Sequence, residues 1–256
     1  MTVVTWGVSL HADAVAASAC PLTLRVSMTN PFSRLALVAC AVVLVADAAF
    51  ATEPAEANLP KVVLVGDSIR MSYAPTVAEQ LKGKAEVVSS QANGGDSGNV
   101  LKRLDEWVIR EQPDVVHFNC GIHDTKRFKA TGKFQVSPEQ YEANLREIVS
   151  RIRKETKATV LFALTTPILD ERAAKTRADR DYELLQASVD QYNAIARKVM
   201  EELKVPVNNL PALFAEGSEH DALKLMNSDG VHFGRDGERL LGERVAAFVR
   251  EHLPKQ

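Results

Sequence analysis

The sequence predicts an α/β fold, a three-layer α/β/α sandwich around a parallel sheet of about five strands. Short, nearly continuous apolar runs recur along the chain, and segments whose apolar residues have helical spacing lie between them. Strands of a parallel sheet are buried on both faces and therefore show such unbroken apolar runs. Alternation of these strands with helices is typical of a sheet that is covered by helices on both faces.

The elements follow one another in a regular order. Strands are predicted at 61–65, 85–89, 114–120, 158–165 and 205–208. Helices are predicted at 71–82, 100–110, 185–203 and 236–253, and another begins after Ser137. Ser137 is suited to cap that helix, because a proline follows it and a glutamine lies three positions further on. The glycine-rich residues 91–99 are predicted to form a turn.

Length and composition agree with a globular protein of one large domain. The chain has 256 residues, of which 46% are apolar and 25% are charged. These fractions exclude wholesale disorder and collagen-like or coiled-coil repeats. The chain has 31 basic and 33 acidic residues and a formal net charge of −2. This balance gives no reason to expect a nucleic-acid partner.

Residues 1–51 are expected to be absent from the mature protein. From Met28 the chain has a basic start, an apolar middle and a small-residue exit at Ala51, which is the build of a secretory signal peptide. We expect residues 1–27 to be an upstream extension, cleavage to follow Ala51, and the mature protein to be periplasmic or secreted without stable membrane insertion. A lipoprotein signal at Cys40 is the alternative, but the apolar stretch before it is short.

The remaining chain divides into a polar linker, 52–60, and a single folded domain, 61–256. Two of the three cysteines, Cys20 and Cys40, fall in the removed segment, so no intrachain disulfide is expected. The third, Cys120, lies in an apolar strand, where a buried core residue is favoured over a nucleophile.

Three polar motifs follow predicted strands, at the edge of the sheet where α/β proteins bind ligands, and a fourth precedes the last predicted helix. They are Gly66-Asp67-Ser68 after the first strand, residues 93–98 after the second, Gly121-Ile122-His123-Asp124 after the third, and Asp229-Gly230-Val231-His232 before the last helix. A serine nucleophile needs a general base, and a histidine held by a carboxylate can supply it. Each motif is common alone, so their order and placement carry the functional prediction.

This set of motifs resembles the SGNH (GDSL-type) hydrolase superfamily, secreted or periplasmic esterases and lipases of flavodoxin-like fold, over residues 61–252. The resemblance implies serine ester hydrolysis that needs no metal or organic cofactor. It implies Ser68 as the nucleophile, His232 as the general base and Asp229 as its carboxylate partner. Ser97, which also follows Gly-Asp, is the rival nucleophile.

The resemblance also implies which groups surround the reacting oxygen. The backbone N–H groups of Ser68 and Gly95 correspond to two donors of an oxyanion hole, with Gly98 as an alternative to Gly95. Asp67 and Asp124 belong to the same motifs and are expected to support the turns. All of these residues lie just beyond predicted strands.

One motif departs from the family pattern. Gly121-Ile122-His123-Asp124 has a histidine where the family has an asparagine that donates to the oxyanion. A neutral histidine can still donate one N–H, so we expect His123 to be the third donor, with Asn119 as a weaker substitute. The departure also leaves open a non-hydrolytic member of the family.

Two charged segments complete the prediction. Residues 170–181 hold four acids and four bases and are predicted to be a solvated loop. Lys126, Arg127 and Lys129 follow the third motif with no acid among them, and form either another solvated loop or a basic rim for an anionic substrate. Export and this rim favour deacetylation of a carbohydrate or other small ester. The alternatives are a lysophospholipase or thioesterase, an acyltransferase, and a non-catalytic glycan-binding protein.

Overall fold

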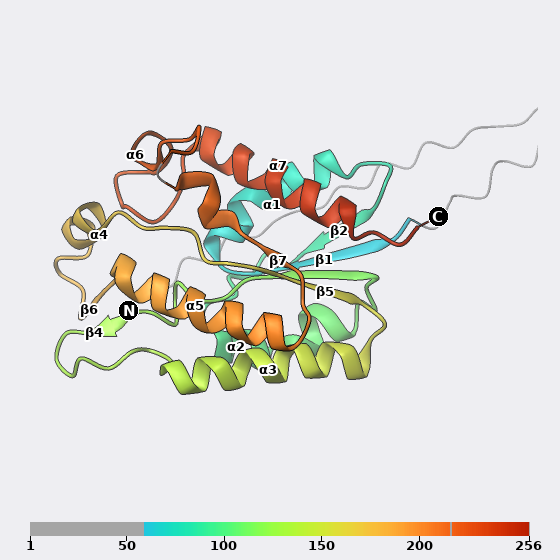
Figure 1. Ribbon diagram of the computed structural model, residues 1–256, viewed down its shortest axis with the longest axis horizontal. Coiled ribbons are helices and arrows are strands. Elements are labelled where there is room, and N and C mark those ends of the chain that lie inside the picture. The colour runs from blue at the N-terminus through green and yellow to red at the C-terminus, as the bar shows by residue number, and fades with distance from the viewer. Residues whose placement is uncertain (1–58, 216, 256) are drawn as a thin grey trace, which may run out of the picture. The chain divides into compact units, whose positions relative to one another are not determined.

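The computed structural model describes residues 59–215 and 217–255 (Figure 1). The expectations for residues 1–51, including the signal peptide and Cys40, lie outside the described residues, as does most of the linker 52–60. None of the described helices is long and apolar enough to cross a membrane.

A five-stranded parallel sheet forms the centre of the fold, as the apolar runs predict. Its strands are β1 (Lys61–Val65), β2 (Glu86–Ser89), β3 (Val115–Phe118), β5 (Thr159–Ala163) and β7 (Val207–Asn208). Their order is β2-β1-β3-β5-β7, and every neighbouring pair is parallel. Val116 in the middle strand pairs with Val63 on one side and with Val160 on the other.

Helices cover both faces of this sheet (Figure 1). On one face lie α1 (Ser68–Gln80) and α7 (Arg235–Glu251); on the other lie α2 (Ser97–Lys102), α3 (Pro138–Glu155) and α5 (Gln186–Glu202). Successive side chains of a strand point to opposite faces. Accordingly Val62 and Leu64 of β1 join the core beneath α1 and α7, whereas Val63 and Val65 join the core beneath α3 and α5.

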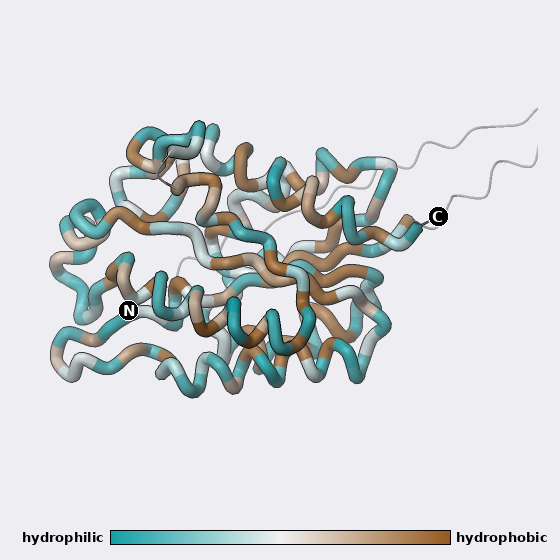
Figure 2. Tube along the Cα trace, in the orientation of Figure 1, coloured by the Kyte–Doolittle hydropathy of each residue, from teal (hydrophilic) through white to brown (hydrophobic). Residues whose placement is uncertain are grey.

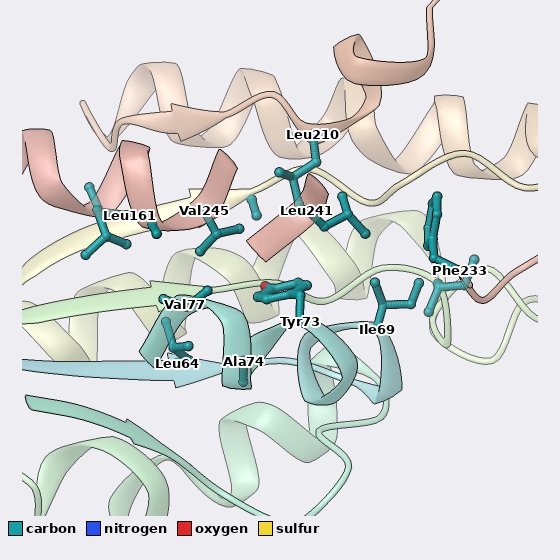
Figure 3. Close-up of a cluster of buried hydrophobic side chains, with 14 of the residues drawn as sticks. Leu64, Ile69, Tyr73, Ala74, Val77, Leu161, Leu210, Phe233, Leu241 and Val245 are labelled. Atoms are coloured by element: carbon teal, nitrogen blue, oxygen red, sulfur yellow. The ribbon is translucent and has the colours of Figure 1, made fainter. Parts of the chain in front are cut away.

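The two apolar layers fill the space between the sheet and the helices. Figure 2 shows hydrophobic residues concentrated in the strands and on the inner sides of the helices, with hydrophilic residues on the outside. Figure 3 shows one layer, in which Tyr73 and Val77 of α1 lie across from Leu241 and Val245 of α7. This packing fixes α1, and therefore the chain that follows β1, on the edge of the sheet where the polar motifs lie.

Capping residues explain where several helices begin. Ser137 accepts a hydrogen bond from the N–H of Gln140 (3.2 Å) and begins α3, as predicted. The helix predicted at 71–82 begins earlier, because Asp67 caps it. The helix predicted at 100–110 begins at Ser97, within the predicted turn, because Asp96 caps it. After this helix the chain continues into a π-helical turn, η1 (Asp105–Ile109).

The prediction of a solvated loop at 170–181 is wrong for the first half of that segment. It forms α4 (Asp170–Thr176), and Arg172 donates to the backbone oxygens of Met226 and Leu223. A small antiparallel sheet of β4 (Arg127–Phe128) and β6 (Tyr182–Glu183) lies near it, at the left of Figure 1. The remaining short elements are η2 (Leu210–Phe214) and α6 (Ala222–Leu225).

Candidate active site

The structure brings Ser68, His232 and Asp229 into one hydrogen-bonded chain. Ser68 Oγ lies 2.8 Å from His232 Nε2, and His232 Nδ1 lies 2.5 Å from Asp229 Oδ2. The serine and the histidine are 164 positions apart in the sequence. A serine, a histidine and a carboxylate in this order can activate the serine hydroxyl for nucleophilic attack.

The loop between α6 and α7 fixes the orientation of the histidine. Asp229 Oδ1 accepts hydrogen bonds from the N–H groups of Val231 and His232, both at 3.0 Å. Partial burial alone would raise the pKa of the Asp229 carboxyl, but its hydrogen bonds to the His232 ring and to these N–H groups hold that pKa below its ordinary value. Asp229 is therefore ionised at neutral pH and can stabilise a protonated His232.

Ser68 lies at the junction between β1 and α1. It is the first residue of the helix, and the first N–H groups of a helix have no acceptor within it. Asp67 makes the turn, since its Oδ1 accepts from the N–H of Ile69 (2.9 Å). This places the Ser68 hydroxyl and its own N–H at the carboxyl end of the central strands, as the family resemblance implies for a nucleophile that also donates to the oxyanion.

The turn after β2 packs closely against the junction between β1 and α1. The N–H of Gly94 donates to the backbone oxygen of Gly66 (2.9 Å), and a Cβ at Gly94 would lie 2.6 Å from that same oxygen. Only glycine allows this approach. The guanidinium of Arg70, almost fully buried, closes the arrangement by donating to Gly66 O and Ala92 O.

Ser97, the rival nucleophile, is buried and has a structural role. Both its N–H and its hydroxyl donate to Asp124, and Asn144 Nδ2 donates to the Ser97 hydroxyl oxygen. Neither Ser97 nor Asp124 is accessible to solvent. The pair ties the loop after β2 to the loop after β3, which gives Asp124 the supporting role that the motif implies.

We expect this buried pair to make stability depend on pH. Burial raises the pKa of Asp124 to about 7. The folded protein therefore binds a proton more tightly than the unfolded chain, and the resulting stability is present below pH 4 and is lost as pH rises toward 7. Thermal unfolding followed from pH 4 to 7 should show a larger loss of Tm in the wild type than in Asp124→Asn. Parallel Tm profiles for the two proteins would contradict this.

Gly95 has a left-handed backbone conformation, and its N–H already donates to a side chain of the same turn. Its φ of +63° is in the left-handed region that favours glycine, and its N–H donates to Asn93 Oδ1 (2.9 Å). Asn93 lines the cavity that contains Ser68. For Gly95 to donate to an oxyanion, the Asn93 side chain must leave this N–H, so the prediction for Gly95 holds only after that rotation. Gly98, the alternative donor, lies within α2.

His123 lines the same cavity as Ser68 and His232. Burial lowers the pKa of His123, and the nearby positive charge of Lys126 acts in the same direction against the opposing effect of Asp67. The ring is thus neutral at neutral pH and carries one N–H. Asn119, its predicted substitute, donates instead to Ala163 O on the neighbouring strand (2.8 Å).

If His123 donates to the oxyanion, His123→Ala should lower kcat by about a hundredfold with little change in KM, because the lost contact forms only in the transition state. His123→Asn places the family's usual donor at this position and should recover much of the loss. Steady-state kinetics with a short-chain aryl ester measure both values. A wild-type rate in His123→Ala would exclude this role.

The cavity at these residues has a volume of about 350 Å³. Beyond the polar groups already described, its walls carry apolar side chains and two cations. The apolar residues are Ile122, Leu184 and Val231, together with the ring of Tyr182, and the cations are Lys126 and Arg177. A space of this kind suits a short acyl group beside a polar or charged alcohol.

Arg177 is a site residue that the sequence analysis missed. Its Nη1 donates to the backbone oxygen of Asp229 (2.8 Å), and its Nη2 lies 3.9 Å from Asp229 Oδ2. Only 13% of its side chain is exposed. It follows α4 in a run of mixed charges that contains no motif, so no local signal separated it from the surface arginines around it.

The predicted basic rim is reduced to one residue. Lys126 lines the cavity. Arg127 instead lies 3.5 Å from Glu183 and donates to Gly132 O, and Lys129 donates to the backbone oxygen of Ala178 (3.0 Å). Both cations bind groups of the protein and link the segment after the third motif to residues 178–183. Neither of them lines the cavity.

Within residues 59–215 and 217–255, no three His, Cys, Asp or Glu side chains are grouped so that they could hold a metal ion. Cys120 is fully buried, and burial raises the pKa of its thiol. Ser68, by contrast, lines the cavity, and its hydroxyl lies within hydrogen-bond distance of His232 Nε2.

Comparison with known proteins finds esterases and acylhydrolases among those similar to this chain. The model of the GDSL-like lipase/acylhydrolase family matches residues 64–240. An acetylxylan esterase of Geobacillus stearothermophilus is 27% identical over 166 residues, which cover 62% of this chain and 70% of that protein. A GDSL esterase/lipase of Arabidopsis thaliana is 26% identical over 212 residues, which cover 75% of this chain and 86% of that protein.

A solved structure shows the same fold. The lipase/acylhydrolase of Enterococcus faecalis superposes with a TM-score of 0.61 at 22% identity, over 77% of this chain and 100% of that one. The family model spans well over half of the chain and includes the serine, aspartate and histidine described above. The chain therefore belongs to the GDSL (SGNH) hydrolase family and is a carboxylic ester hydrolase of that family.

Proposed function

We propose that this protein is a serine esterase that removes short acyl groups, acetyl in the first place, from a carbohydrate outside the cytoplasm. The observation that carries the proposal is the chain of hydrogen bonds from Ser68 through His232 to Asp229 at the wall of a cavity of about 350 Å³. The small volume favours short acyl groups. The similarity to the acetylxylan esterase of Geobacillus stearothermophilus favours acetyl and a glycan, and the signal-like residues 28–51 favour export.

The reaction begins with attack of Ser68 Oγ on the ester carbonyl carbon. His232 Nε2 takes the hydroxyl proton as the new C–O bond forms, and the carbonyl π electrons move onto oxygen. The N–H of Ser68 and a neutral His123 supply donors to this oxyanion, and the N–H of Gly95 joins them once Asn93 has moved away. Asp229 stabilises the imidazolium that forms.

The second half of the reaction regenerates the free Ser68 hydroxyl. The tetrahedral intermediate collapses, the bond to the alcohol oxygen breaks, and His232 gives its proton to the leaving alcohol. Water then attacks the acyl-serine while His232 takes its proton. The Ser68–acyl bond breaks as His232 returns this proton to Ser68 Oγ, and the carboxylic acid leaves. Every proton in this sequence moves through His232.

A panel of acetylated polysaccharides and acyl esters of increasing chain length tests the proposal. We expect release of acetate from at least one acetylated glycan and a steep fall in kcat/KM with acyl chains longer than about four carbons, because the cavity has little room. Preference for long acyl chains or for acyl thioesters would instead support a lysophospholipase or thioesterase. Transfer of the acetyl group to an added sugar, in competition with water, would indicate an acyltransferase.

A further inference from the structure

Lys126 is a half-buried cation in the wall of the catalytic cavity. Its ammonium group lies 5.2 Å from the centroid of the Tyr182 ring. None of the ion pairs formed within the described residues includes it. A partly desolvated charge that lacks an opposite charge is unfavourable unless a ligand supplies one.

The local backbone holds Lys126 at this place. It lies two residues after the third motif, its backbone oxygen accepts from the N–H of Gln135 (2.8 Å), and the next two residues form β4. Pairing of β4 with β6 positions Tyr182 beside the lysine. The backbone and the Tyr182 ring therefore hold the ammonium group at the cavity wall. The neighbouring cations Arg127 and Lys129 instead bind to other groups of the protein.

Two cations line the cavity wall, and one of them is already paired with a carboxylate. Arg177 is a second cation of the same wall, and its contact with Asp229 uses only part of the guanidinium. The Asp229 carboxylate faces His232, two backbone N–H groups and Arg177 Nη2, which lies 3.9 Å from Oδ2. An anionic group that enters the cavity can therefore pair with the Lys126 ammonium group, and charge-assisted contacts of this kind are the strong ones.

We propose that Lys126 determines substrate specificity by binding an anionic group, a carboxylate or a phosphate, on the alcohol part of the ester. This inference rests on the proposed function, because an acetyl group carries no charge and the anion must then belong to the alcohol that leaves. The substrate class is an acetyl ester of an acidic carbohydrate or of a phosphorylated polyol.

Matched pairs of esters test this inference. One pair is an acetylated methyl glucuronoside and the same compound with its carboxyl group methylated; the other is acetylglycerol phosphate and acetylglycerol. We expect the wild type to prefer the charged member of one pair by about tenfold in kcat/KM, the effect of one charge-assisted contact. The pair that shows the preference identifies the carboxylate or the phosphate. Added salt should reduce it.

The variant Lys126→Met should reduce this preference to near one, mainly by raising KM for the charged ester, and Lys126→Glu should reverse it. Lys133→Met is the matched control, because Lys133 lies in the same loop, is exposed, and does not line the cavity. It removes the same charge from the protein and should leave both activities unchanged. This comparison separates a local contact from a general effect of net charge.

Two results would overturn the inference. One is a wild-type enzyme that does not distinguish the members of either pair. The other is an equal fall in kcat for charged and neutral esters in Lys126→Met, which would mean that the lysine stabilises the oxyanion of every substrate. In both cases hydrolysis of the neutral esters still supports the proposed function. Failure to hydrolyse any of the four esters or any acetylated glycan would overturn the proposed function itself.

Discussion

Replacing Ser68 with alanine should lower ester hydrolysis by about four orders of magnitude or more, the cost of losing a nucleophile that acts as a unit with its base. The change removes the oxygen that lies 2.8 Å from His232 Nε2 and leaves the helix cap at Asp67 intact. We therefore expect wild-type circular dichroism and a Tm close to that of the wild type. Release of nitrophenol from a short-chain ester measures the loss.

Ser72→Ala is a matched control on the same helix. The Ser72 hydroxyl donates to Ile69 O (2.8 Å) and lines none of the cavity that contains Ser68, so this variant should keep wild-type activity. A serine-directed organophosphonate should label the wild type at Ser68, leave Ser68→Ala unlabelled, and inhibit in proportion to labelling. A label on Ser97 would refute the assignment, and it would require opening of a buried network.

The strands and the places of the reactive motifs were predictable because their signals are local. A strand buried on both faces needs consecutive apolar residues, and Val62 to Val65 show this directly. The carboxyl ends of parallel strands meet at one edge, so residues that follow them approach one another whatever their separation in sequence. His232 lies before the last helix and not directly after a strand, so its pairing with Ser68 was predictable only from the family resemblance.

Contacts between distant segments left no such signal. Arg177 reaches Asp229 across 52 positions, and its charge run is similar in composition to any solvated segment. The two-residue strands β4 and β6 are too short to show periodicity, yet they place Tyr182 beside Lys126. Sequence alone could not separate the cavity cation Lys126 from Arg127 and Lys129, because only their partners in space distinguish them.

The hydrogen bond from the Gly95 N–H to the Asn93 side chain was missed, although the sequence contains a signal for it. An asparagine side chain commonly accepts from the N–H two residues further on, and Asn93 does so with Gly95. The motif identified Gly95 as a donor but did not show that a neighbour in the same turn already occupies it. The open oxyanion hole thus depends on a side-chain rotation that a pattern of residue types does not encode.

Replacing His232 with alanine should reduce kcat by about as much as Ser68→Ala, since the serine and its base act together and neither is effective alone. The ring is the group through which every proton of the proposed mechanism moves. About 39% of the His232 side chain is exposed, so free imidazole can enter the space that the variant opens. We expect added imidazole to restore part of the activity in His232→Ala and none in Ser68→Ala.

The control for this variant is His220→Ala, which removes an imidazole outside the cavity lining and should leave the kinetics unchanged. Lack of rescue by imidazole, together with a lowered Tm, would mean that His232 supports the loop and that the base lies elsewhere.

Asp229→Asn should be less damaging than His232→Ala and should reveal how the carboxylate acts. The asparagine oxygen can keep the hydrogen bonds from the N–H groups of Val231 and His232, so the loop should remain folded. The amide nitrogen then faces His232 Nδ1 and favours the tautomer whose Nε2 carries the proton, which cannot accept one from Ser68. We therefore expect a large fall in kcat, a nearly unchanged KM, and a rate that increases with pH as hydroxide replaces the disabled base. Full activity in this variant would show that another carboxylate orients His232.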